Sequence, residues 1–203
     1  MGSRESDLLD KLQDVSKKFE KEYEEQIFRF RDRDIFYEEG LFSTSKNIKD
    51  IIGGELEYNL KENEFYFRKN KKIRIKTNNV ATGIKSLGII DMLIANNSLE
   101  SGSLLIIDEP EVHLHPKWQI EYAKVLCELA EEDINILINT HSPYMVEAIN
   151  YHSKQKMIQP DVSFYTTEKL DSYSSELIDC TDNLNAIYTK LSEPIEKLIW
   201  DRY

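Results

Sequence analysis

The sequence is poor in the features that mark several classes of protein. Its two cysteines, Cys127 and Cys180, lie far apart without metal-ligand spacing, which indicates neither a disulfide framework nor a cysteine metal site. No apolar run approaches the ~20 residues that a membrane-spanning helix requires. We therefore expect a cytoplasmic protein with reduced thiols and no membrane partner, and we expect Cys127 to be buried in an apolar helix.

Positive charge is also scarce. The 203 residues include 26 Lys and Arg against 37 Asp and Glu, which gives a formal net charge of -11. This balance argues against a strongly basic nucleic-acid module, although it leaves a local basic patch open. A hydrophobic content of 40% is ordinary for a folded globular protein and allows a real core.

One apolar stretch organises the rest of the chain. Leu104 to Ile107 are four aliphatic residues without alternation, a pattern that predicts a strand buried on both faces of a parallel sheet. Asp108 and Glu109 follow at the carboxyl end of this strand, where open α/β sheets bind their ligands. Successive strand side chains point in opposite directions, so the two acids can do different jobs. One can hold Mg²⁺ and the other can activate a water.

A second aliphatic run, Ile134 to Ile138, ends in Asn-Thr-His-Ser-Pro, which contains His141. A helix predicted from Pro116 to Glu131 separates the two strands. The order strand, helix, strand predicts a right-handed parallel βαβ crossover. His141 is therefore expected at the same edge of the sheet as Asp108 and Glu109.

These two motifs resemble those of a known family. Asp-Glu-Pro-Glu-x-His-Leu-His-Pro followed by Thr-His-Ser-Pro is similar to the RecF/OLD-type, ABC-related AAA ATPases, over roughly residues 52–203. The resemblance implies an α/β fold of the P-loop NTPase class, with ATP and Mg²⁺ as cofactors. It also implies that Asp108 binds the metal, Glu109 orients the attacking water and His141 is the switch histidine at the γ-phosphate.

The family's signature loop corresponds to Thr82, Gly83 and Lys85. A hydroxyl, a glycine and free amides precede a helix predicted from Lys85 to about Ala95, and such helix starts bind anions. By resemblance this loop reaches across a dimer to the γ-phosphate held by the partner subunit. Thr82 replaces the family's usual serine, so the hydroxyl is kept but the match is imperfect.

A P-loop is missing from the sequence, since no Gly-Lys pair occurs anywhere. The nearest approach, residues 40–47, is interpreted as a loop and as the cap, Ser45, of a helix from Lys46 to Ile52. We therefore expect residues 46–203 to be the C-terminal half of an ABC/AAA-type ATPase domain without its Walker A loop. Alone, this chain is expected to be inactive, and ATP and Mg²⁺ would serve the full-length or complemented protein.

Residues 1–45 are predicted to be a charged, amphipathic helical segment, which is an arm or a lid by resemblance to the family and an ordinary packing helix otherwise. Its apolar residues recur in steps of three and four from Leu8 to Phe30. This seam favours a homodimer if the helix does not fold back, whereas a helix that folds back would leave a monomer. The missing N-terminal half, on the same or a separate chain, is a further expected partner. DNA or an effector protein is left open. The resemblance places the protein in DNA maintenance or anti-phage defence.

Short strands are predicted at residues 55–60, 64–68 and 73–75, forming an antiparallel meander. Its second turn and third strand are rich in Lys and Arg, which leaves two interpretations open, a nucleic-acid contact and a solvated hairpin. Further elements are predicted near the end of the chain. They are strands at 162–165 and 176–178 and helices at 184–191 and 194–200.

Two other functions compete with the ATPase. The first is a nucleotide-gated clamp or adaptor without significant turnover, in which the dimer interface carries the function. The second is a metal hydrolase, because histidines alternating on an extended stretch can bind a metal. Its ligands would come from a set around the central motif: Asp108, Glu111, His113, His115 and His141.

Overall fold

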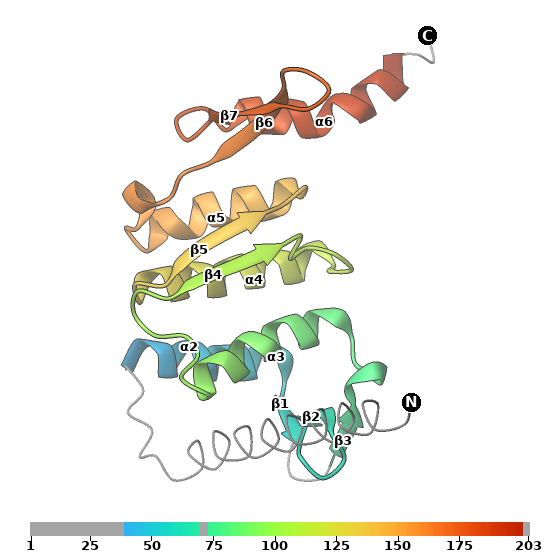
Figure 1. The fold of residues 1–203 in the computed structure, drawn as a ribbon, viewed down its shortest axis with the longest axis vertical. Coiled ribbons are helices and arrows are strands. Elements are labelled where there is room, and N and C mark those ends of the chain that lie inside the picture. The colour runs from blue at the N-terminus through green and yellow to red at the C-terminus, as the bar shows by residue number, and fades with distance from the viewer. Residues whose placement is uncertain (1–38, 70–72, 201–203) are drawn as a thin grey trace, which may run out of the picture. The chain divides into compact units, whose positions relative to one another are not determined.

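The computed structural model describes residues 39–69 and 73–200 (Figure 1). The described residues fall within one compact unit, Glu38–Tyr203. The predicted amphipathic helix from Leu8 to Phe30, with its dimer seam, lies outside them. In the described part of the chain, no helix is both long enough and apolar enough to cross a membrane.

A parallel pair of strands forms the centre of the fold. β4 (Leu104–Asp108) and β5 (Asn135–Asn139) pair in parallel, with Ile106 opposite Leu137 and Asp108 opposite Asn139. α4 (Pro116–Glu131) connects the two strands, and α5 (Pro143–Gln155) follows and packs against α4. The predicted parallel βαβ crossover is therefore confirmed.

The prediction that the first strand is buried on both faces is wrong. Leu104 and Ile106 are 64% and 63% exposed, and Leu137 beside them is 55% exposed. Figure 1 shows α4 and α5 on the same side of the two strands, so they cover only one face. Among residues 39–69 and 73–200, nothing buries the other face, and the sheet therefore presents an open apolar surface made of these three side chains.

The antiparallel meander is confirmed. β1 (Glu55–Asn59), β2 (Glu64–Lys69) and β3 (Ile73–Lys76) pair in that order. A short 3₁₀ turn, η1 (Thr77–Asn79), leads to α3 (Thr82–Ala95), which contacts β1. The turn into β1 needs glycine, because a Cβ on Gly54 would lie 2.4 Å from the backbone oxygen of Arg68.

The helix before β1 starts earlier than predicted. α2 runs from Glu39 to Ile52, so residues 40–47 are helical and Ser45 is an interior residue rather than a cap. The physical reason is a buried stripe at helical spacing that packs against α3 and α4. A phosphate-cradling loop is therefore not formed here. The buried stripe consists of Leu41, Thr44, Ser45, Ile48 and Ile52.

The C-terminal part combines a hairpin with one helix. β6 (Tyr165–Lys169) and β7 (Ser175–Asp179) are antiparallel, after a 3₁₀ turn, η2 (Gln159–Asp161). The strand predicted at 162–165 is wrong, since β6 begins where that strand was expected to end. The two predicted closing helices are a single α6 (Asn185–Trp200) with Pro194 inside it. Ile187 of α6 packs with Val146 and Cys180 in a small cluster.

Candidate functional site

The ends of β4 and β5 bring polar groups together at one edge of the sheet. The side-chain amide of Asn139 donates to Asp108 Oδ1 at 3.3 Å, and the backbone N–H of Glu109 donates to the Asn139 carbonyl at 2.9 Å. Asp108, Glu109 and Asn139 are all exposed. The edge therefore offers carboxylate and amide oxygens that remain accessible to a ligand.

Glu109 and His141 meet at this edge. Glu109 Oε1 lies 3.5 Å from His141 Nε2, and the two side chains are 47% and 81% exposed. An exposed pair of this kind adds little to stability. Glu109 also has a φ of 45°, a left-handed conformation that is costly for a residue with a side chain. The arrangement thus favours access to the two side chains over stability.

A second layer of contacts holds the segment that carries His141. Glu111 Oε1 accepts from the backbone N–H of His141 at 2.6 Å. The hydroxyl of Ser142 donates to Gln119 Oε1 at 2.5 Å, and the amide of Gln119 donates to the Leu114 carbonyl at 2.9 Å. Gln119 and Ser142 are both buried. Glu111 and Gln119, which follow β4 in the chain, therefore hold His141 and Ser142, the consecutive residues that follow β5.

The sequence interpretation missed Gln119. The signal for it was available, because Gln119 lies on the face of α4 that also buries Tyr122, Ala123 and Leu126. A polar residue on a predicted apolar stripe needs a hydrogen-bond partner once it is buried. The identity of that partner, Ser142, depends on how α4 meets α5, and the spacing of residues along one helix does not give it.

The proposed signature residues form the start of α3. The helix begins at Thr82, earlier than predicted, so Thr82, Gly83 and Lys85 all lie in its first turn. Ala81 precedes them as an N-cap without a side-chain hydrogen bond. Gly83 is buried, and a Cβ on it would lie 2.7 Å from Leu114 Cδ2. The start of α3 therefore packs tightly beside the loop that follows β4.

The signature residues are not joined to the acids of the same chain. Within the described ranges, no hydrogen bond or ion pair connects Thr82 or Lys85 with Asp108, Glu109 or His141. The structure thus contains two separate groups of candidate residues, one at the strand ends and one at the start of α3.

The geometry gives the metal-hydrolase alternative no support. In the part of the chain that the structure describes, no three His, Cys, Asp or Glu side chains are grouped as a metal site requires. His115 caps α4 instead, because its Nδ1 accepts from the Lys117 N–H at 3.2 Å.

Three of the basic residues in the described part of the meander are paired with acids. Arg68 lies 3.3 Å from Glu57, Arg74 lies 2.8 Å from the same carboxylate, and Lys76 lies 2.6 Å from Glu64. For these three residues the pairing favours the solvated hairpin over a contact with phosphates.

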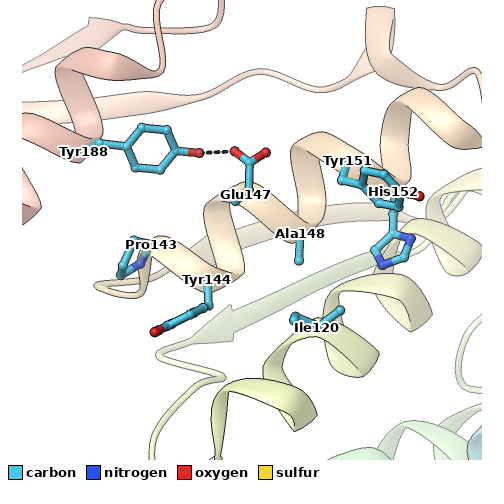
Figure 2. Close-up of a pocket in the computed structure, with 8 residues that line it drawn as sticks. All are labelled: Ile120, Pro143, Tyr144, Glu147, Ala148, Tyr151, His152 and Tyr188. Carbon is cyan, nitrogen blue, oxygen red and sulfur yellow. Dashed lines mark hydrogen bonds between the residues drawn. The ribbon is translucent and has the colours of Figure 1, made fainter.

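A hollow of about 510 Å³ is lined by residues of α4, α5 and α6 (Figure 2). Tyr188 of α6 donates to Glu147 of α5 beside it at 2.5 Å. Burial lowers the pKa of His152, which also lines the hollow. None of the candidate site residues lines the hollow, which is formed by Ile120, Pro143, Tyr144, Glu147, Ala148, Tyr151, His152 and Tyr188.

Burial also explains the cysteine on α4. Cys127 is buried, as predicted, and burial raises the pKa of its thiol to about 11. The thiol is therefore protonated at neutral pH and serves as a packed apolar group rather than a nucleophile.

The sequence was also compared with known protein families and proteins. Residues 3–146 match the model of the AAA ATPase domain family. An 81-residue stretch is 33% identical to the OLD nuclease of Thermus scotoductus, covering 39% of this chain and 15% of that protein. A 94-residue stretch is 29% identical to an uncharacterized protein of Methanocaldococcus jannaschii, covering 46% of this chain and 11% of that one. The matched stretches therefore span a small part of these relatives.

Solved structures of SMC ATPases are also similar. One, studied for ATP-driven dimerization and DNA-stimulated activation, aligns with a TM-score of 0.49 and 14% identity, covering 74% of this chain and 92% of that chain. The Smc head of Pyrococcus furiosus, bound to the C-terminal domain of ScpA, aligns with a TM-score of 0.46 and 16% identity. That alignment covers 79% of this chain and 38% of that chain. Both TM-scores lie below 0.5, so the family rests on the sequence match.

Proposed function

This chain belongs to the AAA ATPase domain family, and on that premise we propose that it supplies the Walker-B, signature and switch parts of a nucleotide hydrolase. The RecF/OLD-type, ABC-related class predicted from the two motifs is confirmed. The observation that carries the proposal is the meeting of Asp108, Glu109 and His141 at the carboxyl ends of two parallel strands. Open α/β sheets bind their ligands at this edge.

Nucleotide hydrolysis at this edge needs a metal-binding group, a group that acts on water and a donor to phosphate. Asp108 and Asn139 offer exposed oxygens of the hard type that Mg²⁺ prefers, so the residues present fit this ion. When bound, Mg²⁺ supplies charge neutralisation for the phosphates. We assign Asp108 to hold the ion, Glu109 to orient and deprotonate the attacking water, and His141 to donate a hydrogen bond to the γ-phosphate.

The start of α3 is proposed to act on a second nucleotide. Its first backbone N–H groups have no side-chain cap, and a helix start of this kind attracts anions. We assign Thr82, Gly83 and Lys85 to contact the γ-phosphate bound by the partner subunit of a homodimer. Within the described ranges, no hydrogen bond or ion pair joins these residues to Asp108 or Glu109, which supports a role between subunits.

The open sheet face supports a role as half of an ATPase domain. Leu104, Ile106 and Leu137 form an apolar surface that a complete α/β sheet would cover. The sequence also has no Gly-Lys pair with which to cradle phosphates. We propose that residues 46–203 form the C-terminal half of the domain, completed by a P-loop half on the same or another chain. A role in DNA maintenance or anti-phage defence, with DNA or an effector as partner, belongs to the same proposal.

The test is phosphate release by the protein encoded by the complete natural reading frame. Glu109→Gln removes the base but keeps the size of the side chain, so we expect turnover to fall about 10²- to 10⁴-fold while ATP still binds. Glu100→Gln, at an exposed site outside the edge, is the matched control and should leave turnover unchanged. The 203-residue chain alone should show no turnover above background.

Two results would contradict this assignment. Equal phosphate release by the wild type and Glu109→Gln would favour the nucleotide-gated clamp, in which turnover is not the function. Robust turnover by the 203-residue chain that is lost in Glu109→Gln would keep the enzyme but overturn the half-domain. A phosphate-binding loop would then exist within these residues.

A further inference from the structure

Glu111 joins the two loops that carry the candidate site. Its backbone is fixed in the loop after β4, where the Leu114 N–H donates to the Glu111 carbonyl at 2.8 Å. Its side chain crosses to the loop after β5 and accepts from the His141 N–H at 2.6 Å. This carboxylate therefore reaches a residue 30 positions later in the chain, at the point where the imidazole of the site is attached.

The position of His141 depends on its backbone. The imidazole is 81% exposed, so packing does not place it. The backbone that carries it is held at the His141 N–H by Glu111, and the following residue is held by the bond from Ser142 to Gln119. A charge-assisted hydrogen bond to a backbone N–H is among the stronger contacts available to a loop.

Stability does not account for this carboxylate. Glu111 Oε2 is buried and has no hydrogen-bond partner among the described residues. A buried acceptor without a partner costs free energy. The loop also contains Glu109 and His113 at φ values of 45° and 62°, left-handed conformations that are unfavourable for residues with side chains. Costs of this kind are typical of functional loops.

We propose that Glu111 is a positioning residue, which sets the place of His141 relative to Glu109 by holding the His141 N–H. The inference rests on the proposed function, because it identifies the residue that aligns Glu109 with His141 for nucleotide hydrolysis. It differs from the earlier interpretation of Glu111 as a metal ligand, since the side chain acts through the backbone of the neighbouring loop.

The test uses amide hydrogen exchange of the full 203-residue chain, followed by NMR without nucleotide. Glu111→Ala removes the acceptor, so exchange of the His141 N–H should accelerate by about tenfold or more. Glu111→Gln keeps an oxygen at the same reach and should retain most of the protection. The nuclear Overhauser contact between the His141 ring and the Glu109 side chain should be present in the wild type and Glu111→Gln, and weak or absent in Glu111→Ala.

Two controls separate positioning from a structural role. Glu100→Ala removes an exposed acid elsewhere and should change neither observation. The denaturant midpoint of Glu111→Ala should equal or exceed that of the wild type, because the substitution also removes a buried oxygen without a partner. Unchanged His141 exchange in Glu111→Ala, or faster exchange throughout the chain with a lower midpoint, would overturn the proposal. No nucleotide is present, so failure of the ATPase assignment leaves these readouts intact.

Discussion

At the scale of single residues, Asp91 shows how burial alters a charge in the helical layer. The Asp91 side chain on α3 is 3% exposed, accepts from the Ser45 hydroxyl at 2.6 Å, and lies 3.6 Å from the Lys49 ammonium group. Burial is the largest influence and raises the pKa of Asp91 above its ordinary value, despite the opposing effects of Ser45 and Lys49. The folded protein therefore binds the Asp91 proton more tightly than the unfolded chain does.

This difference predicts a pH-dependent stability. A carboxyl whose pKa is raised on folding contributes to the free energy of unfolding through its proton. This contribution is fully present below the unfolded pKa of about 3.9, where the group is protonated in both states. Its contribution is lost as pH rises through the raised pKa of the folded state. The denaturant midpoint of the wild type, measured against Asp91→Asn, should therefore fall as pH rises from about 4 towards neutrality. A difference between the two proteins that stays constant, or rises with pH, would contradict the account.

At the scale of elements, the packing of α3 on β1 depends on a glycine. Gly88 is a buried residue of α3, and a Cβ on it would lie 2.5 Å from Leu56 Cγ on β1. Glycine inside a helix ordinarily costs roughly 1 kcal/mol relative to alanine. The close approach of the strand explains why alanine would bring no such gain here.

Gly88→Ala is expected to destabilise the protein by about 1 to 3 kcal/mol, because the overpacked contact outweighs the gain in helix propensity. Urea unfolding of the single variant measures the loss. The double variant Gly88→Ala, Leu56→Ala tests the cause, since removing the facing side chain should make the glycine substitution favourable in the Leu56→Ala background. If the single variant were more stable than the wild type, β1 would be able to move away from the added methyl group without a loss of stability.

The elements also show what the sequence can predict. The strands before Asp108 and His141 and the crossover between them were predictable, because their aliphatic runs end at polar motifs. The start of α2 was not, since Ser45 has the residue type of a cap but is buried against Asp91. The single α6 was missed because Pro194, which usually interrupts a helix, lies within it. Sequence patterns within a segment predict whether it forms a helix or a strand. Which of its residues are buried depends on the elements that pack against it.

The same limit applies to the candidate site. Asp108, Glu109 and His141 were selected from motifs, and their common edge follows from the parallel crossover. The contact of Gln119 with Ser142 was not predictable, because it forms only when α4 packs against the start of α5. The contact of Glu111 with the His141 N–H was not predictable either, because it depends on how the loops after β4 and β5 meet. The unbroken run from Leu104 to Ile107 suggested two covered faces, although the described residues cover one.

At the scale of the whole molecule, the open face of β4 and β5 predicts self-association of the 203-residue chain. Exposed apolar patches are common sites of contact between proteins. Ile106→Thr with Leu137→Thr should shift light scattering towards the monomer while changing the free energy of unfolding little, because both side chains are already more than half exposed.

Leu105→Thr with Ile136→Thr, on the partly buried face of the same strands, is the matched control. It should lower stability without relieving association. Association unchanged in the first variant would show that another surface, such as the predicted seam from Leu8 to Phe30, holds the copies together.

The central claim is that Glu109 and His141 act together at the strand ends, where their side chains lie 3.5 Å apart. A double-mutant cycle on single-turnover phosphate release, in the protein from the complete reading frame, tests it most directly. Glu109→Gln and His141→Ala should each slow release by about 10²-fold or more, and the double variant should be little slower than the slower single variant. Full activity in either single variant, or effects that multiply in the double variant, would contradict a shared site.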